Sequence, residues 1–254
     1  MKFVSCILAI AMLFSIANIC SFAEDAAIEP PAESFDAYFP RLNGSYGGYE
    51  VPERSSDYRL VKAVYQYFSQ GEVPVITDFI YENGEFIGTV TSFGEPRKEI
   101  PLSSTSTYVM SDVEYKFSED RLSYDVTQYG YTHTVRLNEN RLTNKINTFN
   151  FFASKIKEDP NWSSGGNACS RDDDGLIVGN SFSNSEIKYR YEYKASPDGK
   201  LQALLKYDDY NGSTSSTPNR AIEFDEHGNL TFFDGAVYDG FFGNFIEYYY
   251  EPVE

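Results

Sequence analysis

Several stretches of this chain alternate polar side chains with aromatic or β-branched ones. In the clearest, residues 187–193, Ile187 and three tyrosines at every second position are separated by Lys188, Arg190 and Glu192. The same alternation recurs in residues 61–68, 113–117 and 222–224. A period of two places alternate side chains on opposite faces of an extended strand. The chain is therefore predicted to be all-β.

Short turn signals separate the alternating stretches, at residues 82–85, 118–120, 138–140, 196–199 and 226–229. Asn-Gly and Asp-Gly pairs within them supply the positive φ angles of tight hairpins. Strands joined so closely must pair antiparallel. We expect an antiparallel meander of hairpins, curled or packed as two layers.

One stretch admits a second interpretation. Residues 58–68 also place Leu60, Val64 and Phe68 along one side of a helix, but their aromatic content and the absence of a stop signal favour a strand. The helix expected elsewhere is a short one from Phe151 to Lys157, ended by Asp159-Pro160.

The first 23 residues are typical of a secretory signal peptide. Lys2 precedes an uncharged, mostly apolar run over residues 3–20, and Ser21-Phe22-Ala23 offers small residues for cleavage. A retained membrane anchor is the alternative, but Glu24 follows at once and no basic flank is present. We expect an exported protein that is secreted, periplasmic or at the cell surface.

The predicted organisation after the signal has two parts. Residues 24–55 are acidic and rich in proline and glycine, which favours a flexible lead-in outside the core. Residues 56–254 form the β-rich domain, and a subdivision near residues 151–176 stays open. Cys6 and Cys20 belong to the signal, so Cys169, in a loop by composition, has no disulfide partner.

A formal charge of −17 limits the partners. It argues against nucleic acid and against anionic membrane surfaces, because both are polyanions and no basic stripe is present. The expected partner is a protein or a glycan outside the cytoplasm.

The chain contains an internal repeat at a spacing of 20 residues. Val113–Tyr129 matches His133–Phe149, and both copies are expected to read strand, turn, Arg-Leu, strand. Residues 137–143, 193–201 and 224–231 resemble the YD hairpins of RHS-type repeat proteins, in which an aromatic-Asp pair precedes a glycine turn. Those bacterial surface and secreted proteins wind such hairpins into long sheets or shells. The resemblance implies a bacterial exported β-meander, without the toxin-encapsulating function.

The densest acidic cluster, Arg171 to Gly175, has some of the features of a calcium loop. Asp172 and Asp174 are the candidate ligands, but the closing Glu of an EF-hand is absent and the glycine is misplaced. A solvated acidic loop is favoured, and calcium bound with help from distant residues stays open. His133 and His227 are isolated, so no zinc site and no other cofactor is expected.

No sequence motif marks an enzyme. The chain has no G-x-S-x-G nucleophile motif, and its many carboxylates leave open a secreted hydrolase that uses a pair of them. A small outer-membrane β-barrel is a further alternative.

Aromatic residues carry the favoured function, a non-enzymatic binding or structural module that presents an aromatic-rich sheet. Tyrosine rings can stack on sugars or anchor a protein partner. The alternative role for the same rings is cross-strand stabilisation of the sheet. The candidate binding residues are Trp162, Tyr248, Tyr249 and Tyr250.

Overall fold

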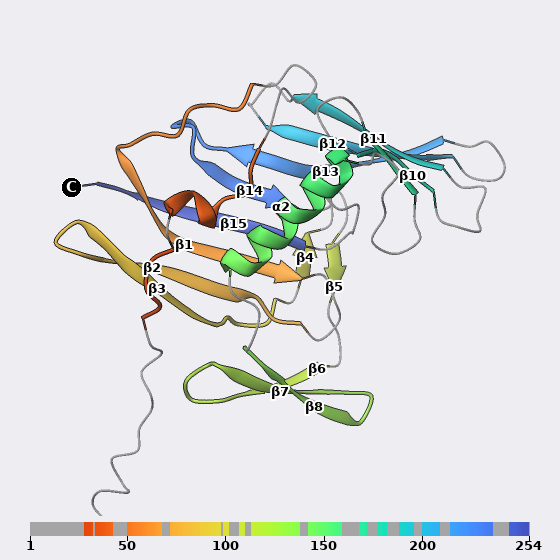
Figure 1. Cartoon of the computed structure of the whole chain (residues 1–254). Helices are drawn as coiled ribbons and strands as arrows, with labels where there is room; N and C mark the ends of the chain where they lie inside the picture. Colours follow the sequence, from red (N-terminus) through yellow and green to blue (C-terminus); the bar gives the residue numbers. More distant parts are fainter. Residues whose placement is uncertain are drawn as a thin grey trace, which may run out of the picture.

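The computed structural model describes residues 28–32, 34–42, 50–67, 72–97, 99–101, 107–109, 113–137, 142–158, 168–171, 177–181, 188–195, 200–208, 214–235 and 244–253. Over these residues the protein consists mostly of strands in antiparallel sheets, with one α-helix (Figure 1). The predicted all-β class and antiparallel pairing are confirmed.

Ten strands build the large sheet: β1 Tyr58–Tyr67, β2 Val75–Glu82, β3 Glu85–Phe93, β9 Ala168–Arg171, β10 Ile177–Ser181, β11 Lys188–Ala195, β12 Leu201–Asp208, β13 Thr214–Phe224, β14 Leu230–Asp234 and β15 Asn244–Pro252. Their spatial order is β3-β2-β1-β15-β14-β13-β12-β11-β10-β9. Strands β9 to β15 are a meander, as predicted. The last strand then pairs with the first, with Ala63 opposite Tyr248. The first and last strands of the described chain therefore meet inside one sheet.

The remaining elements include η1, a 3-10 helix over Phe35–Tyr38. Between β3 and β9 in the sequence lie β4 Glu99–Pro101, β5 Thr107–Val109, β6 Val113–Phe117, β7 Ser123–Gln128, β8 Tyr131–Arg136 and α2 Leu142–Glu158. Strands β6, β7 and β8 form a three-stranded sheet, and β4 pairs with β5. Neither helix in the described part of the chain is long and apolar enough to span a membrane.

The core forms where α2 and η1 pack across one face of the large sheet (Figure 1). Leu142, Ile146 and Phe149 of α2 are 3%, 0% and 3% exposed. Phe149 meets Phe233 of β14 with ring centroids 5.6 Å apart. Burial of each such side chain stabilises the fold by roughly 1.5–3 kcal/mol.

Helix α2 corrects the predicted repeat. The first copy forms the β6–β7 hairpin and the second begins with β8, as expected, but its second strand was wrong because residues 142–158 are helical. Leu142, Ile146 and Phe149 recur at i, i+4 and i+7, which is one face of a helix. In the first copy, Tyr124 and Val126 are two residues apart and share the buried strand face. The residue that matches Tyr124 in the second copy is the polar Asn144, which breaks the apolar alternation. The helix therefore starts well before the predicted Phe151.

Two further expectations differ from the structure. Cys169 lies in β9, paired with Asn180, and not in a loop. The described part of residues 24–55 contributes Tyr38, 2% exposed, to the core that this segment was expected to avoid. Aromatic residues in η1 explain the packing, because the Phe35 and Tyr38 rings contact Phe79 of β2.

Candidate functional site

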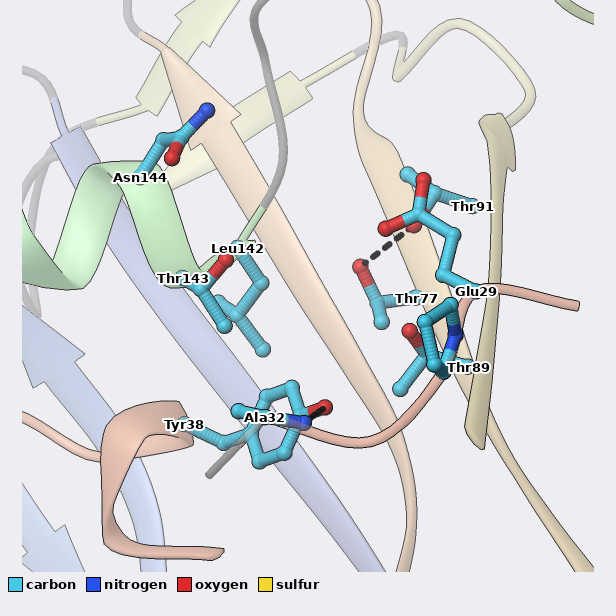
Figure 2. Close-up of a pocket in the computed structure, with 10 residues that line it drawn as sticks. Glu29, Ala32, Tyr38, Thr77, Thr89, Thr91, Leu142, Thr143 and Asn144 are labelled. Atoms are coloured by element: carbon cyan, nitrogen blue, oxygen red, sulfur yellow. Dashed lines mark hydrogen bonds between the residues drawn. The ribbon is translucent and has the colours of Figure 1, made fainter. Parts of the chain in front are cut away.

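A cavity of about 380 Å³ lies between η1, the start of α2, strands β2 and β3, and residues 28–32, which we call the strap (Figure 2). The residues that line it are Glu29, Pro30, Ala32, Tyr38, Thr77, Thr89, Thr91, Leu142, Thr143 and Asn144. They come from three stretches that are far apart in the sequence, residues 29–38, 77–91 and 142–144.

Three threonines of the large sheet form the floor of the cavity. Thr77 lies opposite Thr91, and Phe79 lies opposite Thr89, so the three threonines share the core face of β2 and β3. They are 3%, 7% and 3% exposed for Thr77, Thr91 and Thr89. The Thr77 and Thr91 hydroxyl oxygens are 3.4 Å apart, and the Thr89 hydroxyl makes no side-chain hydrogen bond within the described residues. Buried hydroxyl groups of this kind normally have a hydrogen-bond partner, which a bound ligand could supply.

The strap is held against β3 by backbone pairing. The Glu29 N–H donates to the Thr89 carbonyl oxygen at 2.7 Å, and the Thr89 N–H donates to the Glu29 carbonyl oxygen at 2.9 Å. Gly88 makes this approach possible, since a Cβ atom there would lie 2.1 Å from the Glu29 carbonyl oxygen. Pro30 has no N–H to continue the ladder. Glu29 is thereby fixed at the rim as the charged residue of the lining.

Tyr38 forms a rigid wall of the cavity. Its hydroxyl accepts a hydrogen bond from the Ala32 N–H at 3.0 Å, which ties the wall to the strap. Its ring packs edge-on against Phe79 and Phe86, with centroids 5.0 and 5.8 Å away. Behind it, the Tyr248 hydroxyl donates to the Tyr38 carbonyl oxygen at 3.0 Å.

The first turn of α2 closes the opposite side, where Leu142, Thr143 and Asn144 line the cavity (Figure 2). Leu142 is buried and apolar, whereas Asn144 is exposed and carries an amide. The lining thus combines buried hydroxyls, apolar walls and polar rim groups. That combination suits a compact ligand with hydroxyls and C–H surfaces.

A second group of titratable residues surrounds Glu72, just before β2. Burial raises the pKa of the Glu72 carboxyl, and the positive charges of Lys145 and His133 oppose the shift. Burial, with Glu72 nearby, also raises the pKa of Tyr115 to about 12 and raises the pKa of Tyr124. Five separate segments therefore bring ionisable groups to the junction between α2 and the three-stranded sheet.

Another carboxyl with a raised pKa is Asp78, where burial outweighs the attraction of Lys62. The described residues contain no group of three or more His, Cys, Asp or Glu side chains placed to hold a metal ion.

The predicted binding tyrosines do not share one surface. Tyr248 is 3% exposed, Tyr249 is 46% exposed, and the half-buried Tyr250 donates its hydroxyl to the Leu230 carbonyl oxygen at 2.9 Å. Alternation along β15 turns Tyr248 and Tyr250 to the core face and Tyr249 to the other. The remaining candidates, Trp162, Asp172 and Asp174, lie outside the described residues.

The two histidines also lie apart. His227 occupies the β13–β14 turn, where its ring stacks on Tyr58 with centroids 4.3 Å apart and its Nε2 atom is 2.9 Å from the Tyr58 hydroxyl. His133 is exposed on β8.

Sequence reasoning missed the threonine floor. The available signal was polar Thr77 on the same strand face as Val75 and Phe79, a place where an apolar residue is expected. Nothing in the local sequence indicates that the strap and α2 would meet above it.

Comparison with known proteins adds no relative. No protein family matches the chain, and no curated protein is similar to it. One solved structure, described as a candidate thioesterase II from Thermobifida fusca, is 11% identical over 79% of this chain and 96% of that chain, with a TM-score of 0.12. A TM-score of this size carries no functional argument.

Proposed function

We propose that this protein is an exported binding module whose cavity takes a small polyhydroxylated ligand, such as one sugar residue of a glycan. The observation that carries the proposal is the set of three buried threonines facing a cavity of about 380 Å³. That volume lies within the range of about 300–1,000 Å³ typical of small-molecule sites.

The chemistry of the lining favours a sugar. A sugar ring carries hydroxyls together with C–H surfaces, and each threonine offers both a hydroxyl and a methyl group. Tyr38, Ala32 and Leu142 supply apolar contact, and Asn144 adds an amide at the rim. The Glu29 carboxylate disfavours an anionic ligand, so we expect a neutral or amino sugar.

Export is supported by the signal-like first 23 residues, and the RHS-like segments at residues 193–201 and 224–231 support a bacterial extracytoplasmic role. The wider function that we propose is presentation of this cavity on an envelope or secreted protein. No catalytic step is part of it.

The test is a titration with neutral monosaccharides and amino sugars, followed by calorimetry and by NMR of threonine methyl groups. We expect saturable binding that shifts the Thr77, Thr89 and Thr91 methyl signals. Thr89→Val keeps the side-chain shape, removes the hydroxyl and should weaken binding at least about fivefold.

The matched control is Thr231→Val, which removes a half-buried threonine hydroxyl bonded to the Glu223 carbonyl oxygen on β13. It should leave the affinity unchanged. Absence of binding across the sugar panel, or equal weakening by both substitutions, would contradict the proposal.

One observation favours a second candidate, a hydrolase that uses carboxylates. The raised pKa of Glu72, among Lys145, His133 and two tyrosines, is typical of a general acid. Chromogenic glycosides and esters would be assayed with the unmodified protein and with Glu72→Gln. Turnover that the substitution abolishes supports this candidate, and absence of turnover in the unmodified protein removes it.

A further inference from the structure

We infer that β8 is a docking edge for an extended segment of a partner protein that carries a carboxylate side chain. The inference is independent of the cavity, because it concerns the three-stranded sheet and a macromolecular partner.

Strand β8 pairs on one side only within the described residues. Its register with β7 runs without a bulge from Tyr131 opposite Gln128 to Arg136 opposite Ser123. The sheet is anchored through β7, whose Tyr124 and Val126 are each 1% exposed. By contrast, every residue of β8 except Val135 is exposed. Strand β7 is thus fixed to the core, whereas β8 beside it is exposed to solvent.

The hairpin geometry shows which backbone groups of β8 point outward. A two-residue loop, Tyr129-Gly130, joins the strands, so Gln128 and Tyr131 form a hydrogen-bonded pair and the pairs alternate from there. The Leu137 N–H donating to the Leu122 carbonyl oxygen at 2.9 Å fits this alternation. The N–H and C=O groups of Thr132, Thr134 and Arg136 therefore face away from β7.

The outer edge of β8 lacks the usual protection against pairing. It contains no proline, lysine or bulge, three of the devices that block edge strands, and Arg136 at its end is its one permanently charged side chain. The edge of β3 differs, because the strap pairs with it at Thr89 and Pro30 then ends that pairing. An added strand on β8 would satisfy its outward backbone groups, as in β-augmentation.

Charge and exposed rings indicate the chemistry of the partner. Strand β8 carries His133 and Arg136 and no carboxyl, in a chain of net charge −17. His133 interacts electrostatically with the Glu72 carboxyl, whereas Arg136 forms no ion pair with any described residue. Tyr129 and Tyr131 at the hairpin tip are 79% and 81% exposed. A segment with a carboxylate facing Arg136 and an apolar residue over these rings fits the edge.

The test measures binding of two fluorescent peptides to the purified protein by anisotropy. One alternates glutamate with valine over six residues, and the other alternates lysine with valine. We expect the glutamate peptide to bind at least about tenfold more tightly. Equal binding, tighter binding of the lysine peptide, or no binding of either would overturn the inference.

Variants separate edge pairing from nonspecific attraction. Thr134→Pro removes an outward N–H and blocks the edge, while Thr134→Val loses the same side-chain bond to Asp125 but keeps the N–H. We expect at least about tenfold weaker binding for the proline variant alone. Arg136→Glu should reverse the peptide preference. Equal binding by both Thr134 variants, or self-association by light scattering that Thr134→Pro abolishes, would instead contradict a peptide partner.

Discussion

The Tyr248 hydroxyl donates a hydrogen bond to the Tyr38 carbonyl oxygen at 3.0 Å, across a sequence separation of 210 residues. It joins the interior strand β15 to η1 and so supports the wall of the cavity. A buried hydrogen bond of this kind contributes about 0.5–1.5 kcal/mol, and losing one partner costs more because the other is left unpaired.

Replacing Tyr248 by Phe should therefore lower the free energy of unfolding by about 1–2 kcal/mol and weaken sugar binding, because the wall is loosened. Urea denaturation and calorimetric titration measure the two effects. Tyr250→Phe is the matched control, since it loses a similar bond, to the Leu230 carbonyl oxygen, away from the cavity lining. Tyr250→Phe should lower the free energy of unfolding by a similar amount and leave sugar binding unchanged. An equal loss of affinity in both variants would contradict the role of the Tyr248–Tyr38 hydrogen bond in supporting the cavity wall.

Substitution of Gly88 should detach the strap. A Cβ atom at this position would overlap the Glu29 carbonyl oxygen, and the φ angle of +153° is one that other residues rarely adopt. Gly88→Ala should destabilise the protein by about 2 kcal/mol and expose residues 28–32 to limited proteolysis.

The control for the strap is Gly84→Ala, at φ +83° with no atom within 4 Å of the added Cβ. It carries the backbone strain of about 1 kcal/mol without the overlap. Cleavage of the strap at the same rate in both variants would contradict the assigned contact.

The Thr77 and Thr91 hydroxyls are expected to couple weakly. Either single valine substitution leaves the other hydroxyl without its 3.4 Å partner and should cost about 0.5–1 kcal/mol. The double substitution removes both and should be neutral or stabilising. A double-mutant cycle by thermal unfolding checks this, and strictly additive losses would show that the pair does not interact.

Tyr115 and Tyr124 should respond differently to loss of the hydroxyl. The buried Tyr115 hydroxyl has no hydrogen-bond partner among the described residues, whereas Tyr124 is hydrogen-bonded to the backbone of Val73. Tyr115→Phe should be neutral or stabilising, and Tyr124→Phe should cost about 1–2 kcal/mol. Urea denaturation decides, and the reverse ranking would contradict the structure.

Glu72 should make stability fall as the pH rises. Because the pKa of its folded state is raised above the ordinary 4.5, the folded protein binds the proton more tightly than the unfolded chain does. This contribution is fully present below pH 4.5 and is lost as the pH rises through the folded pKa. Glu72→Gln should therefore have a higher melting temperature than the unmodified protein at pH 7, with the difference shrinking toward pH 4. Asp78, shifted in the same direction, is present in both proteins and does not enter the difference. A difference in melting temperature that does not change with pH would contradict burial as the cause of the raised Glu72 pKa.

Much of the fold could be predicted from local pattern. The alternation over residues 58–68 predicted β1, and the turn at residues 226–229 predicted the β13–β14 hairpin, where Gly228 adopts φ +79°. The helix begins before the predicted Phe151, because the spacing of Leu142, Ile146 and Phe149 fits one face of a helix. Asn144 breaks the strand alternation in the sequence, and the packing of Phe149 on Phe233 confirms the helix in the structure.

The candidate site could not be predicted from local sequence patterns. Thr77, Thr89 and Thr91 are ordinary strand residues until the strap, η1 and α2 converge on them, and Tyr248 gains a role at the cavity only through its bond to Tyr38. By itself, the sequence determined that the protein is all-β and antiparallel, because alternation and turn propensity act between near neighbours. The tertiary structure decided that β15 pairs with β1, that the strap pairs with β3, and that a polar cavity lies beneath α2. Those contacts join residues distant in the chain, and their energy depends on packing that no single segment contains.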